Sequence, residues 1–160
     1  MAENKFKEAI EVINSDLVIP PHTNHIGTIF GGRVLELMDA TGAMAAMRFS
    51  DQDVVTASID AVDFKKPIQL GDIIELRAKV IYTARTSMVV KVDLFRVGKT
   101  DHKKDFSCRG YLIFVAITSE GKPTEVPTLK VRTEEEKDFW AIGEKIKQRA
   151  KERQIRDSQG

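Results

Sequence analysis

Asp39 is the residue of this 160-residue chain whose surroundings most need a chemical explanation. It follows Met38 within an apolar, proline-free run from Arg33 to Phe49. An unpaired carboxylate is costly to bury, so it must find hydrogen-bond donors, become protonated or lie beside a wet cleft. In a cleft it could act as a general base or as a nucleophile. The alternative is an amphipathic helix on which Asp39 merely faces water.

Two features just before this run could assist a carboxylate. Gly31 and Gly32 stand where the helix should begin, and their missing side chains would let a ligand approach the free N–H groups of the first turn. Those groups and the helix dipole could stabilise an oxyanion, although a tight turn also needs glycine. Asn24, in the preceding loop, could hold a carbonyl or a water, or serve as a turn residue.

Other reactive side chains give weaker signals. His22 and His25 lack the companions that a zinc site requires, so we expect no metal, and no organic cofactor is implied. Cys108 is the only cysteine, which excludes an intramolecular disulfide and favours packing as a small apolar residue. The chain has no G-x-S-x-G, Walker A or G-x-G-x-x-G pattern, so the sequence does not support a standard serine hydrolase or a nucleotide-binding loop.

Hydrophobic periodicity predicts the elements that would position these residues. Helical spacing predicts a short lead-in helix over residues 3–13, and a short strand over 17–19 should end at two prolines. The run from Arg33 to Phe49 has apolar residues on nearly every side, which is typical of a buried helix.

Four segments with strand character follow, over residues 55–61, 74–82, 88–94 and 107–118. The last is apolar on both faces and should lie centrally in the sheet. Short connections favour antiparallel pairing. One apolar helix followed by four such strands predicts an α+β fold in which a curved antiparallel sheet wraps around the helix.

A capping box, Thr133 with Glu136, predicts a C-terminal helix that is amphipathic at first. Its amphipathic character should end in a solvated, mainly basic tail. A charge run of this kind is more typical of a solvated helix than of a nucleic-acid contact. We therefore expect a lead-in helix in residues 1–14, one domain in 15–130, and a charged helix and tail in 131–160.

Composition narrows the class of protein. Hydrophobic residues make up 42% of the chain and charged residues 31%, so the chain can bury a sizeable core. Lys and Arg number 25 against 24 for Asp and Glu, which provides no global basic field for nucleic acid. No apolar run is long enough for a bilayer, and the first residues lack the apolar core of a secretory signal. We expect a cytoplasmic protein without nucleic-acid or membrane partners.

The string PHTNHIGTIFGGRVLELMD resembles the hotdog-fold acyl-coenzyme A thioesterases. The similarity continues through VTASIDAVDFKKPIQLGD, ARTSMVVKV and VPTL, and it covers roughly residues 15–153. It is most similar to the branch of bacterial YciA-type enzymes and brain-type cytosolic acyl-CoA hydrolases. The resemblance implies the hotdog fold, a sheet wrapped about a central helix, which agrees with the packing expected from periodicity.

The resemblance also implies an activity, the hydrolysis of medium- to long-chain fatty acyl-CoA to free acid and CoA. By position, Asp39 would be the catalytic carboxylate, Asn24 its partner, and Gly31 and Gly32 the backbone donors for the thioester oxygen. Family members form dimers with the sites between subunits, often assembled into hexamers as trimers of dimers. Many bacterial members carry Asp where this chain has His22.

Helix geometry gives a separate reason to expect a shared site. Gly31 and Asp39 are eight residues apart, about 12 Å along an α-helix. A base and an oxyanion hole must each lie about 3 Å from one thioester group. We therefore predict that Asp39 of one copy works with Asn24, and with the Gly31 region, of another.

Coenzyme A carries phosphates, so a local cationic patch should accompany the site. The candidates are Arg85, Thr86 and Ser87 in a strand turn, together with Lys65 and Lys66. Arginine can meet phosphate bidentately, whereas lysine acts as a point charge. Ordinary solvated turn charges are the alternative for each of them.

Two other functions fit the same fold. A non-catalytic acyl-CoA sensor would usually carry a DNA-binding segment, and we find no helix-turn-helix. An enoyl-thioester hydratase or dehydratase would typically pair a histidine with an acid, and the run from Arg33 to Phe49 has no histidine.

Overall fold

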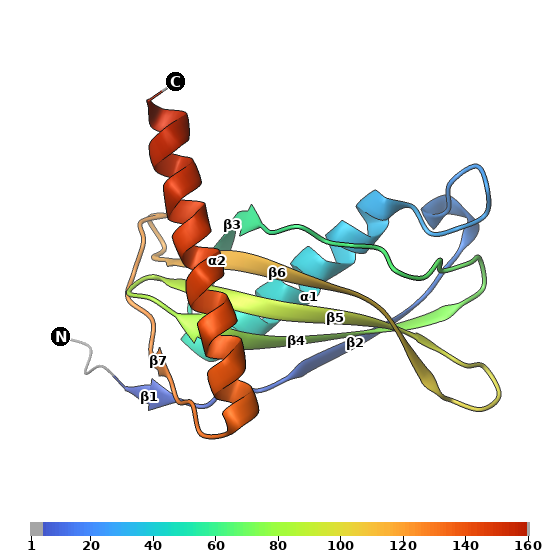
Figure 1. The fold of residues 1–160 in the computed structure, drawn as a ribbon, viewed down its shortest axis with the longest axis horizontal. Helices are drawn as coiled ribbons and strands as arrows, with labels where there is room; N and C mark the ends of the chain where they lie inside the picture. The colour runs from blue at the N-terminus through green and yellow to red at the C-terminus, as the bar shows by residue number, and fades with distance from the viewer. Residues whose placement is uncertain (1–4, 160) are drawn as a thin grey trace.

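The computed structural model describes residues 5–159, in which a five-stranded antiparallel sheet separates two long helices (Figure 1). A two-stranded parallel pair, β1 with β7, lies beside it. In chain order the elements are β1 (Phe6–Lys7), β2 (Val12–Leu17), the short 3-10 helix η1 (Pro20–His22), α1 (Gly31–Ser50), β3 (Asp53–Ile59), β4 (Ile73–Thr83), β5 (Ser87–Val97), β6 (Lys104–Ile117), β7 (Thr128–Leu129) and α2 (Glu134–Ser158).

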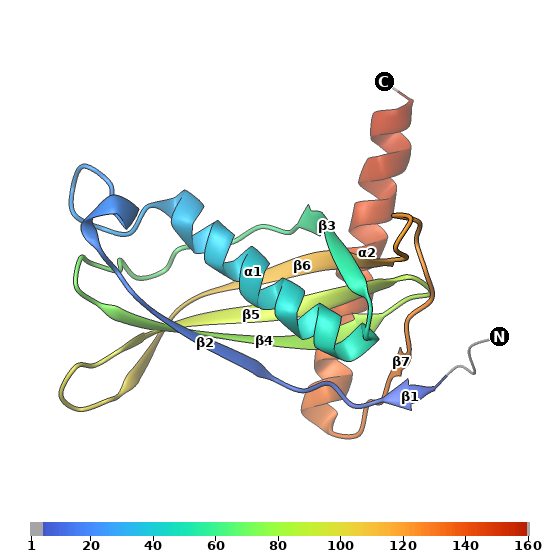
Figure 2. The same cartoon turned by 180° about the vertical axis from the view of Figure 1, so that it is seen from behind.

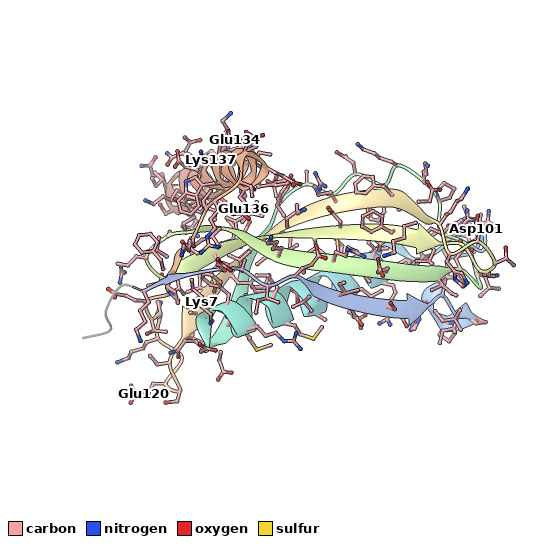
Figure 3. The ribbon with its side chains drawn as sticks, turned by 90° about the horizontal axis from the view of Figure 1, so that it is seen from below. Lys7, Asp101, Glu120, Glu134, Glu136 and Lys137 are labelled. Atoms are coloured by element: carbon pink, nitrogen blue, oxygen red, sulfur yellow. The ribbon has the colours of Figure 1, made fainter. Side chains whose placement is uncertain are left out.

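The strand order is β2-β4-β5-β6-β3, so β2 and β3 form the two edges. Strands β4, β5 and β6 are joined by consecutive hairpins, as their short connections predict. Strand β6 has a neighbour on each side, although β5 is the middle strand. Helix α1 lies along one face of the sheet (Figure 2), and α2 crosses the opposite face (Figure 3).

The core lies between α1 and the sheet, and it confirms the predicted α+β hotdog arrangement. Buried residues of α1, among them Val34, Met38 and Phe49, pack against the inner faces of the strands. A second, smaller cluster lies beneath α2 and contains Ile113 and Ile146. The sheet is therefore apolar on both faces where the helices cross it.

The N-terminal segment differs from the prediction. Residues 5–13 contain no helix; β1 is followed by β2, which pairs with β4 from Val12 onward. Residues 3 and 4 of the predicted helix lie outside the described residues. Isolated helices this short are marginal in water, and the β-branched Val12 and Ile13 gain a full ladder by joining the sheet edge. Of the short strand predicted over 17–19, only Leu17 belongs to β2; residues 18 and 19 lie outside it, and η1 begins at Pro20.

The C-terminal helix is longer than the prediction. Thr133 accepts a hydrogen bond from the Glu136 N–H at 3.1 Å, as the capping box requires, but Glu136 reaches the N–H of Arg132 instead of Thr133. The basic stretch does not dissolve; α2 continues to Ser158. Burial of Ala150 against the sheet, beyond the amphipathic first half, explains why the helix persists.

Neither of the two long helices within residues 5–159 combines the length and apolar character needed to cross a bilayer.

Candidate active site

Asp39 lies in the third turn of α1 and is half-buried. The composition of this run predicts a helix that is buried on every side, but in the structure one face of α1 is exposed. Within one chain, the sheet covers the face of Met38, whereas Glu36, Ala40 and Met47 are exposed on another. The carboxylate stands at the border between the two faces, so it is partly shielded and still reached by water.

Thr56 is the side-chain partner of Asp39. Its hydroxyl lies 2.5 Å from Asp39 Oδ1 and donates to the carboxylate. Thr56 belongs to β3, the edge strand, so the pair sits where the sheet ends. Sequence reasoning missed Thr56. The alternation of polar and apolar residues in β3 is visible in the sequence, but the polar residue that faces α1 depends on how β3 pairs with β6.

Asn24 is engaged within its own loop. Its Nδ2 donates to Thr28 Oγ1 at 2.7 Å, and its Oδ1 accepts the N–H groups of Ile26 and Thr28 at 3.0 and 3.2 Å. This is the turn role that the sequence left open for it. No hydrogen bond joins it to Asp39 in the described part of the chain, so one copy does not bring the predicted pair together.

Gly31 and Gly32 form the first turn of α1, as predicted. Phe30 precedes them and supplies no side-chain cap. A Cβ on Gly32 would lie 2.8 Å from Cε1 of Phe30, and one on Gly31 would lie 3.8 Å from Cζ of Phe64. The aromatic rings of Phe30 and Phe64, 59% and 53% exposed, therefore flank a bare helix N-terminus. The arrangement suits an acyl thioester, with apolar surface beside N–H donors.

The predicted CoA-binding residues do not form one patch in a single chain. The Lys65 N–H bonds the carbonyl of Ser107, whereas the Thr86 carbonyl accepts the N–H of Ala116. Ser107 and Ala116 are nine residues apart on β6, about 30 Å along the strand. The two groups therefore lie toward opposite ends of the sheet.

Their side chains also differ in availability. Arg85 and Lys65 are exposed, Thr86 is half-buried, and Ser87 is buried. Lys66 pairs with Asp105 at 2.6 Å on the surface. Arg85 and Lys65 are thus the members best placed to meet a phosphate.

A cleft of about 480 Å³ lies away from these residues, between α2 and the N-terminal segment. Its lining mixes acidic and basic side chains with Phe139. None of the predicted site residues lines it, and within residues 5–159 none of the clefts described includes Asp39. The candidate site is an open edge within one chain.

Residues 26–101 match the model of the thioesterase superfamily. The chain is 34% identical over 134 residues to the uncharacterized acyl-CoA thioester hydrolase YkhA of Bacillus subtilis, covering 84% of this chain and 78% of that protein. It is 32% identical over 129 residues to the rat cytosolic acyl coenzyme A thioester hydrolase, 79% of this chain but only 34% of the relative.

Two solved structures are also similar. An acyl-CoA hydrolase of Staphylococcus aureus, in complex with butyryl coenzyme A, coenzyme A and coenzyme A disulfide, has a TM-score of 0.86 and 38% identity, covering 93% of this chain and 91% of that one. An apo-hexameric acyl-CoA thioesterase has a TM-score of 0.83 and 41% identity, covering 89% and 92%.

The staphylococcal hydrolase has also been solved with an asparagine, an aspartate or a threonine replaced by alanine. Those three positions are separated by 15 and 17 residues. Asn24, Asp39 and Thr56 have the same two spacings. Two of them were expected from sequence, and the third is the residue that the fold brings to Asp39.

Proposed function

The chain belongs to the thioesterase superfamily, among its acyl-CoA thioester hydrolases, and from that membership we propose that it cleaves acyl-CoA to a free acid and CoA with Asp39 as the catalytic carboxylate. The observation that carries the assignment is the half-buried Asp39 held by Thr56 at an open sheet edge. A carboxylate so placed keeps a fixed orientation and remains in reach of water and substrate.

Asp39 can act in two ways. As a general base it takes a proton from water while the water oxygen attacks the thioester carbonyl; the C–S bond then breaks, and the CoA thiolate leaves and takes up that proton. As a nucleophile it attacks the carbonyl itself; the C–S bond breaks, CoA leaves as a thiolate that takes up a proton, and the mixed anhydride that remains is hydrolysed by water to the free acid and the Asp39 carboxylate. Either route puts negative charge on the carbonyl oxygen, and the N–H groups of Gly31 and Gly32 are the proposed donors for it. Heavy-oxygen water under single turnover separates the routes, because label in Asp39 requires the anhydride.

A second copy of the chain completes the site. Asn24 and Asp39 do not meet within one chain, and the exposed face of α1 and the edge of β3, with Val55 and Ile59 exposed, remain uncovered. Pairing of two copies along β3 would cover both surfaces and place Asn24 and the Gly31 region of one copy near Asp39 of the other. The hexameric relative supports further assembly into a trimer of dimers.

The CoA portion has its proposed contacts at Arg85 and Lys65. Since these residues lie at opposite ends of the sheet in one chain, we assign the phosphates to one group from each copy. The proposed substrates are medium- to long-chain fatty acyl-CoA molecules in the cytoplasm, and the exposed rings of Phe30 and Phe64 suit the apolar part of the thioester. Activity across a panel of acyl-CoA chain lengths tests this preference.

Release of free thiol from palmitoyl-CoA tests the assignment. The wild-type chain should release CoA, and Asp39→Asn should abolish the release while retaining the fold by circular dichroism. Glu36→Gln is the matched control, because it removes another carboxylate from α1 that pairs with Arg33 and not with Thr56.

Saturable binding of acyl-CoA without thiol release would instead identify a sensor. Conversion of an enoyl-CoA without thiol release would identify a hydratase.

A further inference from the structure

Strand β3 contains an irregularity next to the candidate site. Thr56 pairs with Phe114, but the next pair is Ser58 with Ile113, so Ala57 is an extra residue without a partner on β6. Such a β-bulge bends the strand and changes the direction of the side chains that follow it.

The bulge makes Thr56 and Ser58 face opposite sides of the sheet. In a regular strand, residues two apart share a face. Here their partners on β6 separate them, because Phe114 belongs to the core with α1 and Ile113 to the cluster beneath α2. The contacts agree: Thr56 bonds Asp39 of α1, whereas Ser58 accepts a hydrogen bond from Arg153 of α2 at 3.0 Å.

Helix α2 holds the strand just past the bulge at two points. Arg153 bonds Ser58, and Arg149 pairs with Asp60 at 3.3 Å. The arginines are four residues apart on one helix face; Ser58 lies in β3, and Asp60 directly follows the end of that strand. The Asp60 N–H also donates to the carbonyl of Tyr111, which ties this end of the strand to β6.

These two contacts matter because they secure the strand where its ladder is irregular. Within residues 5–159, β3 is an edge strand with a single neighbour, β6, and the bulge interrupts the ladder between them. The last buried residue of α2 is Ala150, and Arg153 follows it three positions later. The C-terminal end of α2 extends past the sheet (Figure 1). Movement of the strand after Ala57 would carry Thr56 with it.

We propose that Arg149 and Arg153 are positioning residues for thioester hydrolysis: by fixing β3 beyond the bulge, they hold the Thr56 hydroxyl against Asp39. They lie on the face of the sheet opposite Asp39 and act through Thr56. The inference rests on the proposed function, which makes Asp39 the catalytic carboxylate. Small displacements of a catalytic group are costly, since a shift of about 1 Å can lower a rate about a hundred-fold.

The test replaces both arginines with methionine in the full chain and measures thiol release from palmitoyl-CoA. We expect kcat to fall about ten-fold while KM stays within about two-fold, because substrate contacts are untouched. The control is Lys145→Met with Lys151→Met, which removes the same charge from exposed positions of α2 that make no described hydrogen bond or ion pair. That variant should keep the wild-type kcat.

Two other roles of the arginines give different results. If they bind the phosphates of CoA, KM rises and kcat is unchanged. If they only stabilise the helix, their effect on kcat combines additively with that of Thr56→Val. Positioning through Thr56 predicts that, in the Thr56→Val background, the arginine variant lowers kcat by no more than about two-fold further. The first two outcomes overturn the proposal.

A pair of single variants carries the test if the double variant does not fold. Ser58→Ala should lower kcat by removing one anchor without changing α2, and Ser58→Thr, which keeps the hydroxyl, should restore it. Failure of the proposed function is separately visible, because Asp39→Asn would then remain active. If Asp39→Asn and Thr56→Val are impaired while the arginine variant equals wild type, only the positioning inference is overturned.

Discussion

Asp39 and Thr56 come from segments that the sequence presents as unrelated, a helix and a strand 17 positions later. Their 2.5 Å hydrogen bond gives the carboxylate one fixed donor from its own chain. Hydrogen bonds to charged groups are roughly twice as strong as neutral ones, so this bond can set the orientation of the carboxylate that we propose to be catalytic. At the residue scale, the proposed site is a carboxylate with one oxygen held by Thr56 and the other without a side-chain donor among the described residues.

Thr56→Val should lower kcat about ten-fold to a hundred-fold, because a hydrogen bond to a charged group is worth about 1.5–3 kcal/mol and each 1.4 kcal/mol is about ten-fold in rate. Thr56→Ser should retain most of the activity, since it keeps the hydroxyl. Steady-state kinetics with palmitoyl-CoA measure both. Thr100→Val, in the exposed hairpin tip, is the control, and an unimpaired Thr56→Val would remove Thr56 from the site.

Cys108 should be inert in the folded protein. Burial raises the pKa of its thiol to about 11, and the nearby Asp93 adds to the shift. At pH 8 the native thiol should not react with a thiol reagent, whereas the denatured chain should react at its single cysteine. Cys108→Ala should give no signal in either state. Rapid labelling of the native chain would contradict this burial.

The same shift has a consequence for stability. An unfolded thiol loses its proton near pH 8.5, about 2.5 units below the native one. The stabilising contribution of Cys108 is therefore complete below pH ~8.5 and is lost as pH rises toward about 11. Urea unfolding of wild type and Cys108→Ala should show a wild-type chain that loses more stability between these values.

Helix α2 depends on a close contact with the sheet that its sequence alone does not predict. Gly143 is buried against β4, and a Cβ there would collide with Tyr82. Beside it, the ring centroids of Tyr82 and Trp140 are 4.6 Å apart. The glycine thus lets α2 approach the sheet closely enough for its later turns to reach β3.

Gly143→Ala should destabilise the fold although alanine is the better helix former. The gain in helix propensity is about 1 kcal/mol, while overpacking costs about 1–3 kcal/mol and the clash involves the Cβ of Tyr82 rather than a flexible tip. Denaturant unfolding should show a net loss of stability. Ala141→Gly, at an exposed position of the same helix, measures the propensity difference alone. A stabilised Gly143→Ala variant would mean that α2 packs less closely.

At the scale of the whole molecule, one chain does not bring the residues of the proposed site together. The bare start of α1 and the Asp39–Thr56 pair are in different parts of the surface, and the exposed face of α1 continues toward the open edge of β3. A symmetric dimer places the same patch on both copies and yields two equivalent sites. Each site would then draw its carboxylate from one copy and its amide and oxyanion donors from the other.

Mixing inactive Asp39→Ala and Asn24→Ala chains should restore activity. With random exchange, half of the dimers are mixed and each has one intact site, so about a quarter of the wild-type activity should return. Thiol release after mixing measures it, and mass analysis with distinguishable tags proves exchange. If activity does not return although subunit exchange is proven, the prediction that two copies share each site is wrong.

Sequence alone determined the elements with strong local signals. The apolar run around Asp39 gave α1, the alternating segments gave β3 to β6, and Thr133 with Glu136 gave the start of α2. These signals are hydrophobic periods of 3.6 residues for helices and 2 residues for strands. Because they involve only neighbouring residues, they can be recognised without knowledge of the fold. The resemblance to acyl-CoA thioesterases added the family and the candidate roles of Asp39 and Asn24.

Tertiary structure alone decided the features that depend on pairing between distant segments. The segment around Val12 is a strand because it forms hydrogen bonds with β4. Helix α2 continues past its amphipathic half because Ala150 is buried against the sheet. The bulge at Ala57 determines that Thr56 faces Asp39 while Ser58 faces α2. A shift of one residue in pairing reverses the face of every following side chain, and no local pattern in β3 records where that shift occurs.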